Sequence, residues 1–166
     1  MRSHLSKILA LSLMFAGACG ASAPAPEAAA PSLRAGLKIS HTSVYVDDQE
    51  KALRFYTEVL GFAKKDDVSN GPYRWLTVTA SGDADGTELQ LALNDDPAAK
   101  AHQQAMFQQG QPAVMFYTDD VKRDYVRIKA SGAEFTMPPT EVMAGSIIAK
   151  LKDTCGNLIQ ITQLAR

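Results

Sequence analysis

The sequence contains little cysteine, which limits the sulfur chemistry open to the protein. Only Cys19 and Cys155 occur among its 166 residues, and there is no Cys-x-x-Cys pair. If Cys19 is lipidated or left in an N-terminal tail, Cys155 stands alone and cannot form an internal disulfide. Cys155 lies in the segment Asp153–Asn157, which has the composition of a hairpin turn and no neighbouring base. We therefore interpret Cys155 as a turn residue and not as a nucleophile.

The sequence also lacks an excess of positive charge and the common signatures of several enzyme classes. Its formal net charge at pH 7 is -1, without a basic cluster. Affinity for nucleic acid depends mainly on Lys and Arg that neutralise phosphates, so we expect no nucleic-acid partner. There is no glycine-rich phosphate loop, no Gly-x-Ser-x-Gly and no His-Glu-x-x-His.

A membrane-spanning run is missing as well, but the N-terminal region has the layout of an export signal. Arg2 and Lys7 provide a positive start, and the apolar stretch Ile8–Ala18 is too short to span a bilayer as a helix. Small residues then lead to Cys19, which resembles the site at which bacterial lipoproteins are cleaved and lipidated. The same small residues also suit ordinary signal peptidase.

The segment that follows is rich in Ala and Pro and has no apolar periodicity, as in a disordered tether. We expect a signal peptide at residues 1–18, a tether at 19–36 and a folded domain at 37–166. The mature protein should be exported, either as a periplasmic protein or as a lipoprotein anchored to the membrane through lipidated Cys19.

An internal repeat organises the folded domain. Val44–Asp48 resembles Phe116–Asp120, 72 residues later, and each segment has the pattern of an apolar strand ending in an acidic pair. Each pair can accept hydrogen bonds from the first turn of a following helix. Each helix should end at a glycine, Gly61 or Gly132. The apolar stripes of the two helices consist of Ala52, Phe55, Tyr56, Val59 and Leu60, and of Val121, Tyr125 and Ile128.

Three strands are expected after each helix. The first contains Phe62 or Phe135, and the others cover Trp75–Thr79, Thr87–Leu93, Ser146–Lys150 and Leu158–Thr162. In Thr87–Leu93, leucines 89, 91 and 93 alternate with Glu88 and Gln90, so the two sets should face opposite ways. The sequence thus predicts an α+β fold of two βαβββ modules, residues 37–96 and 110–166, joined by a linker helix at 97–109. A helix covers one face of each sheet, and the other face is free to line a cup.

These elements resemble the vicinal oxygen chelate superfamily, which is glyoxalase-, bleomycin-resistance- and dioxygenase-like. The resemblance rests on Ile39–Asp48, Ala52–Tyr56, Val59–Phe62 and Asp153–Ile161, and it covers about Leu37–Leu164. It implies a cup-shaped mixed β-sheet and a homodimer. It does not select a reaction, because the superfamily contains several enzyme classes as well as proteins that only sequester drugs.

The resemblance also implies positions for a metal ion. Metal-using members hold the ion through the opening strand and the last strand of each half, which places the ligand positions at His41, Glu88, Ala113 and Gln160. The repeat offset of 72 residues agrees, because it relates position 41 to 113 and position 88 to 160. Ala113 cannot bind a metal, and Gln160 offers an amide oxygen without charge. His41, Glu88 and Gln160 are therefore the candidate ligands for a divalent ion such as Mn²⁺, Fe²⁺, Mg²⁺ or Zn²⁺. Glu88 is also the candidate catalytic residue, for proton transfer.

The sequence is compatible with two functions. The first is a small-molecule-binding protein that holds its ligand in the cup, with candidate contacts from Tyr45, Tyr73, Trp75, Gln90 and Tyr117. The second is a divalent-metal-dependent lyase, isomerase or dioxygenase-type enzyme that uses His41 and Glu88. The residues at positions 113 and 160 favour binding. An exported location argues against glutathione chemistry, because that thiol is cytoplasmic.

Overall fold

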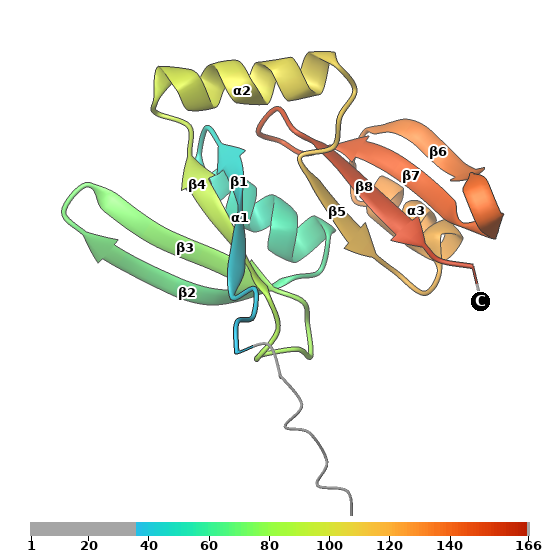
Figure 1. Cartoon of the computed structure of the whole chain (residues 1–166), viewed down its shortest axis with the longest axis horizontal. Helices are drawn as coiled ribbons and strands as arrows, with labels where there is room; N and C mark the ends of the chain where they lie inside the picture. The colour runs from blue at the N-terminus through green and yellow to red at the C-terminus, as the bar shows by residue number, and fades with distance from the viewer. Residues whose placement is uncertain (1–35, 166) are drawn as a thin grey trace, which may run out of the picture. The chain divides into compact units, whose positions relative to one another are not determined.

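The computed structural model describes residues 36–165, and the chain from Leu37 onward forms one compact unit (Figure 1). The predicted signal peptide at 1–18, the tether up to residue 35 and Cys19 lie outside the described residues. No helix within residues 36–165 combines the length and the apolar character needed to cross a bilayer.

The first half has the order βαβββ. Its elements are β1 (His41–Val46), α1 (Gln49–Arg54) with a π-helical turn at Phe55–Val59, β2 (Ala63–Asn70), β3 (Tyr73–Thr79) and β4 (Glu88–Leu93). They form a four-stranded sheet of order β1-β4-β3-β2 in which only β1 and β4 are parallel. Helix α2 (Pro97–Gln108) connects this half to the next.

The second half repeats the order. It contains β5 (Val114–Tyr117), α3 (Val121–Ala130), β6 (Phe135–Glu141), a short 3₁₀ turn at Met143–Gly145, β7 (Ile147–Lys152) and β8 (Leu158–Gln163). The sheet order, β5-β8-β7-β6, matches that of the first half. The predicted α+β fold of two βαβββ modules is therefore confirmed, with two separate four-stranded sheets.

Local sequence signals fix where both main helices begin and end. Asp48 accepts a hydrogen bond from the Lys51 N–H at 2.9 Å, and Asp120 accepts one from the Arg123 N–H at 2.9 Å. Gly61 has φ of 90°, a conformation that L residues with a side chain rarely adopt. One departure from the expected regular helix is the π-helical turn, in which the Leu60 N–H donates to the Phe55 carbonyl at 3.1 Å.

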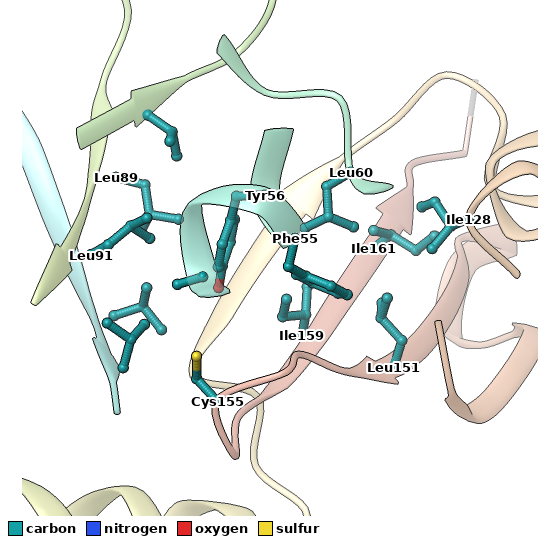
Figure 2. Packing of buried hydrophobic residues seen from close by; sticks show 14 of the residues in the cluster. Phe55, Tyr56, Leu60, Leu89, Leu91, Ile128, Leu151, Cys155, Ile159 and Ile161 are labelled. Atoms are coloured by element: carbon teal, nitrogen blue, oxygen red, sulfur yellow. The ribbon is translucent and has the colours of Figure 1, made fainter. Parts of the chain in front are cut away.

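A single core joins the two halves. Phe55 and Tyr56 are both buried, and Figure 2 shows Phe55 pointing toward Leu151 and Ile159 of the second half while Tyr56 lies on the side of Leu89 and Leu91. The core therefore lies on the helix-covered faces of the two sheets. The expected alternation in β4 holds for Leu89 and Leu91, but Leu93 is 40% exposed because the strand ends there. The opposite faces of both sheets carry exposed side chains such as Tyr45 and Tyr117.

Candidate functional site

The open face of the first sheet brings His41 and Glu88 together. Strands β1 and β4 run parallel with His41 directly opposite Glu88 and Ser43 directly opposite Gln90. Because partners in a strand pair share a face, the four side chains form two adjacent rows. His41 and Ser43 are exposed, and Glu88 and Gln90 are half-buried.

Aromatic side chains border this pair. The rings of His41 and Trp75 meet edge to face, with centroids 5.0 Å apart and an interplanar angle of 86°. The His41 Nδ1 atom lies 3.0 Å from the hydroxyl oxygen of Ser40. Further along β1, the Tyr45 ring packs edge to face against His102 of α2, at 6.3 Å between centroids. The face thus offers flat, partly exposed surfaces to which an aromatic molecule can bind.

A chain of hydrogen bonds crosses the same face. The Ser43 hydroxyl donates to the Gln90 amide oxygen at 2.7 Å, and the Gln90 amide nitrogen donates to the Tyr73 hydroxyl oxygen at 3.1 Å. Tyr73 is 53% exposed, so its hydroxyl is accessible from outside. Of the residues predicted to bind ligand, Tyr45, Tyr73, Trp75 and Gln90 therefore come together on one face. Ser43, which the sequence analysis did not assign to the site, also lies on this face. Its position two residues after His41 on the same strand could have predicted this.

A cleft of about 220 Å³ opens beside Gln90 and Tyr73. Arg74 lines it and is held by two carboxylates, with Nε 2.7 Å from Asp67 and a terminal nitrogen 2.6 Å from Glu50. The Arg74 guanidinium, followed by Lys64, keeps the pKa of Asp67 well below its usual range. The pKa of Arg74 is in turn raised above its usual value by Asp67 and then by Glu50. The remaining lining residues are Gln49, Pro72, Ala92, Leu93 and Asp95.

The open face of the second sheet carries different chemistry. Gln160 lies opposite Met115, and its amide nitrogen donates to the Thr162 hydroxyl at 3.1 Å and to the Met115 sulfur at 3.5 Å. Tyr117 is 77% exposed and lines another cleft, of about 180 Å³, with Phe62 and Arg127 among its walls. Tyr117 therefore lies on the second sheet, apart from the other predicted ligand-binding residues on the first sheet.

The strand registers correct the equivalence that sequence spacing suggested between Glu88 and Gln160. In the first half Val44 pairs with Leu91, and in the second half Phe116 pairs with Ile161. The second half has two residues fewer between its first and last strands. As a result Gln160 occupies the position of Gln90, and the counterpart of Glu88 is Leu158.

The donor set does not fit a tightly held divalent ion. Within residues 36–165 no group of three His, Cys, Asp or Glu side chains is arranged to hold a metal. His41 and Glu88 supply one imidazole and one carboxylate from a single sheet. Gln160 lies on the other sheet with its amide directed at neighbours. A catalytic divalent ion usually has at least three protein ligands, and two are too few for tight binding.

Cys155 lies apart from this site, in surroundings that make its thiol unreactive. It is buried in the turn between β7 and β8, where the Asp153 carboxylate accepts hydrogen bonds from the backbone N–H groups of Cys155 and Asn157 at 2.8 and 2.7 Å. Burial, followed by the nearby Asp47, raises the pKa of the Cys155 thiol to about 11. A neutral, buried thiol is a poor nucleophile, in keeping with a turn residue.

Comparison with known proteins places these features in a family. A family model described as Glyoxalase/Bleomycin resistance protein/Dioxygenase superfamily matches residues 38–161. The uncharacterized protein YurT of Bacillus subtilis is 51% identical over 127 residues, which span 76% of this chain and 99% of YurT. A probable lactoylglutathione lyase of Vibrio cholerae is 31% identical over 129 residues, covering 76% of this chain and 90% of that protein. Among solved structures, TnmS3, an antibiotic binding protein from a Streptomyces species, is 31% identical with a TM-score of 0.62; the match covers 80% of this chain and 99% of TnmS3.

Proposed function

The chain belongs to the Glyoxalase/Bleomycin resistance protein/Dioxygenase superfamily, and we propose that it acts there as a small-molecule-binding protein and not as a metal-dependent enzyme. The observation that carries this proposal is the chemistry of the open sheet faces. The equivalent positions 90 and 160 both hold neutral glutamines, and aromatic rings border Gln90. Such a surface binds by shape, ring contacts and a few directed hydrogen bonds.

Similarity to TnmS3 supports a binding role, because that protein is described as binding an antibiotic. The probable lactoylglutathione lyase of Vibrio cholerae is also 31% identical, so identity alone does not separate binding from catalysis. The donor set supports binding over metal-dependent catalysis. Of the four candidate ligand positions, two carry ionisable side chains, His41 and Glu88, and a metal-dependent lyase, isomerase or dioxygenase needs a more complete set.

The protein contains a single tryptophan, Trp75, and it lies on the proposed binding face. Titration of the full chain with a library of aromatic compounds, followed by Trp75 emission, tests the proposal. We expect saturable changes for some compounds, with weaker affinity in Gln90→Ala and unchanged affinity in Gln104→Ala, an exposed position on α2. Two results together would contradict the proposal and favour the metal-dependent enzyme. The purified protein would contain stoichiometric Mn, Fe, Mg or Zn and show lactoylglutathione lyase turnover, and both would be lost in His41→Ala.

We also propose that the protein forms a twofold homodimer. Met115 and Tyr117 on the second open face are 64% and 77% exposed, and large apolar side chains in such positions favour coverage by another surface. A dimer would cover part of this face and enclose the ligand further. Light scattering at tens of micromolar is expected to give the mass of two chains, and a monomer mass would refute this arrangement.

For location, we propose export with a lipid anchor on Cys19, on the basis of the N-terminal sequence alone. Mass spectrometry of the native protein is expected to find a mature chain that begins at Cys19 and carries a lipid. Cys19→Ser should release the protein from membranes. Recovery of chains with an intact Met1 in the cytoplasmic fraction would refute export.

A further inference from the structure

The hydrogen-bond chain on the first sheet has a fixed direction. Ser43 donates its proton to the Gln90 amide oxygen, which leaves the Gln90 amide nitrogen as the donor to Tyr73. The Tyr73 oxygen is thus already an acceptor, and its own proton must be directed elsewhere. A hydroxyl that accepts a hydrogen bond is also a better donor, because linked hydrogen bonds polarise one another. Tyr73 also lines the neighbouring cleft, so this proton is available to a ligand that binds there.

The charges around that cleft have an unbalanced sign. Arg74, its one cationic lining residue, is engaged by both Asp67 and Glu50. Asp95 also lines the cleft, and in the part of the chain that the structure describes no Lys, Arg or His lies within salt-bridge distance of it. Lys64 also pairs with Asp67, at 3.2 Å, so two cations and two carboxylates balance here, and Asp95 leaves one negative charge in excess. The local field therefore favours a cation over an anion.

Apart from the amides of Gln49 and Gln90, the remaining walls of the cleft are apolar or aromatic. Pro72, Ala92 and Leu93 line it with the Tyr73 side chain, and Leu93 is 40% exposed. Its volume of about 220 Å³ is below the range usual for drug-sized ligands, about 300 to 1,000 Å³. One aromatic ring with short substituents is of the right size, and an aromatic face such as Tyr73 also attracts a cation directly.

We infer that this cleft takes a small aromatic cation that carries a carbonyl oxygen, with the carbonyl accepting the Tyr73 proton and the positive charge facing Asp95. This inference rests on the proposed binding function and specifies the ligand class for that site. Gln90 acts as the positioning residue, because its amide sets the direction of the Tyr73 hydroxyl without being required to touch the ligand.

Three isosteric probes separate the two parts of the inference. The cationic ketone is 4-acetyl-N,N,N-trimethylanilinium; 4-isopropyl-N,N,N-trimethylanilinium lacks only the carbonyl, and 4-tert-butylacetophenone lacks only the charge. In calorimetric titration of the full chain we expect the cationic ketone to bind about three- to tenfold more tightly than the isopropyl cation, the range for one neutral hydrogen bond. It should also bind about two- to fivefold more tightly than the neutral ketone at low salt, as for a partly exposed ion pair.

Variants then assign each preference to a residue. Tyr73→Phe should abolish the preference for the carbonyl and keep the preference for the charge, whereas Asp95→Asn should do the reverse. Gln90→Glu replaces the amide donor by a carboxylate that accepts the Tyr73 proton, so the carbonyl preference should be lost although Tyr73 is intact. Tyr125→Phe, the same change on α3, is the matched control and should leave all three affinities unchanged.

Equal binding of the acetyl and isopropyl cations to the parent chain, or a carbonyl preference that survives in Tyr73→Phe, would overturn the hydrogen-bond assignment. Equal binding of the cationic and neutral ketones would overturn the charge assignment. If none of the three probes binds the full chain, the ligand class is wrong. The broader binding function is then judged separately by the Trp75 titration with the compound library, which does not depend on these probes.

Discussion

Removing the Gln103 side chain should destabilise the protein strongly, because this one amide joins three segments. Gln103 on α2 is only 7% exposed. Its amide nitrogen donates to the carbonyl oxygens of Tyr45 and Cys155, both at 2.9 Å, and to the Asn157 side-chain oxygen at 3.0 Å. Its amide oxygen accepts from the Asn94 side chain at 2.6 Å. The residue therefore connects α2 to β1 in the first half and to the β7–β8 turn in the second.

The magnitude follows from the partners left behind in Gln103→Ala. The Tyr45 carbonyl keeps a second donor, the Asn157 amide at 2.8 Å. The Cys155 carbonyl, the Asn157 side-chain oxygen and the Asn94 amide each lose a partner in buried surroundings. A buried polar group without a partner costs about 1–3 kcal/mol, and water entering the vacated space recovers part of this. We expect a loss of about 3 kcal/mol, a large share of the roughly 5–15 kcal/mol typical of a domain.

Urea unfolding followed by Trp75 fluorescence and far-ultraviolet circular dichroism measures this loss. Gln103→Met, which keeps most of the volume but not the hydrogen bonds, should lose nearly as much as Gln103→Ala. Gln104→Ala, next to it on the exposed side of α2, should change the free energy of unfolding by less than about 0.5 kcal/mol. A loss below about 1 kcal/mol in both Gln103 variants, with an unchanged denaturant slope, would refute the view that this amide joins the halves.

Three further predictions concern the core, a helix end and the buried thiol. Leu91→Ala, at a fully buried position of β4, should lower the free energy of unfolding by about 2–5 kcal/mol in urea titration. Gly61→Ala should lower it by about 1–2 kcal/mol in the same assay, because φ is 90° at this position. The added Cβ would meet no atom closer than the Arg127 side chain at 3.9 Å, so the cost comes from the backbone conformation. In a Cys19→Ser chain, Cys155 should react with Ellman's reagent at pH 8 only after urea is added, and fast native reaction would contradict its burial. In the folded protein the pKa of the Cys155 thiol is raised from 9.0 to about 11, so the thiol ionises first in the unfolded chain. The free energy of unfolding should therefore fall as pH rises from about 9 to about 11. This fall should be absent in Cys155→Ala.

Local sequence signals predicted the architecture well because they act over short distances. Asp48 and Asp120 cap their helices as expected, and Gly61 ends the first helix with a positive φ. The apolar stripe of the first helix also predicted which residues are buried. It did not predict the π-helical turn at Phe55–Val59, since an apolar stripe is compatible with either hydrogen-bond pattern.

The register between the first and last strands of each half could not be predicted from the sequence. The repeat offset of 72 residues holds for the first strands of the two halves but not for their last strands. The segments between these strands differ in length by two residues. Gln160 therefore faces the same side of its sheet as the sequence predicted, but it corresponds to Gln90 and not to Glu88. Asp95 could not be assigned to a site for a similar reason. It follows the end of β4, and only the fold shows that the chain there borders the same cleft as Tyr73.

The corrected register explains why a His–Glu pair on adjacent strands need not form a metal site. His41 and Glu88 are neighbours at the start of two parallel strands, so both approach from one sheet. A tightly held ion needs further donors from another direction. The positions that correspond to them in the second half are Ala113 and Leu158, whose backbones pair at 2.9 Å and whose side chains have no donor atom. The feature common to both halves is a glutamine on the last strand. Because an amide both donates and accepts but carries no charge, this shared feature fits recognition of a polar group on a neutral or cationic ligand better than activation of a metal-bound oxygen.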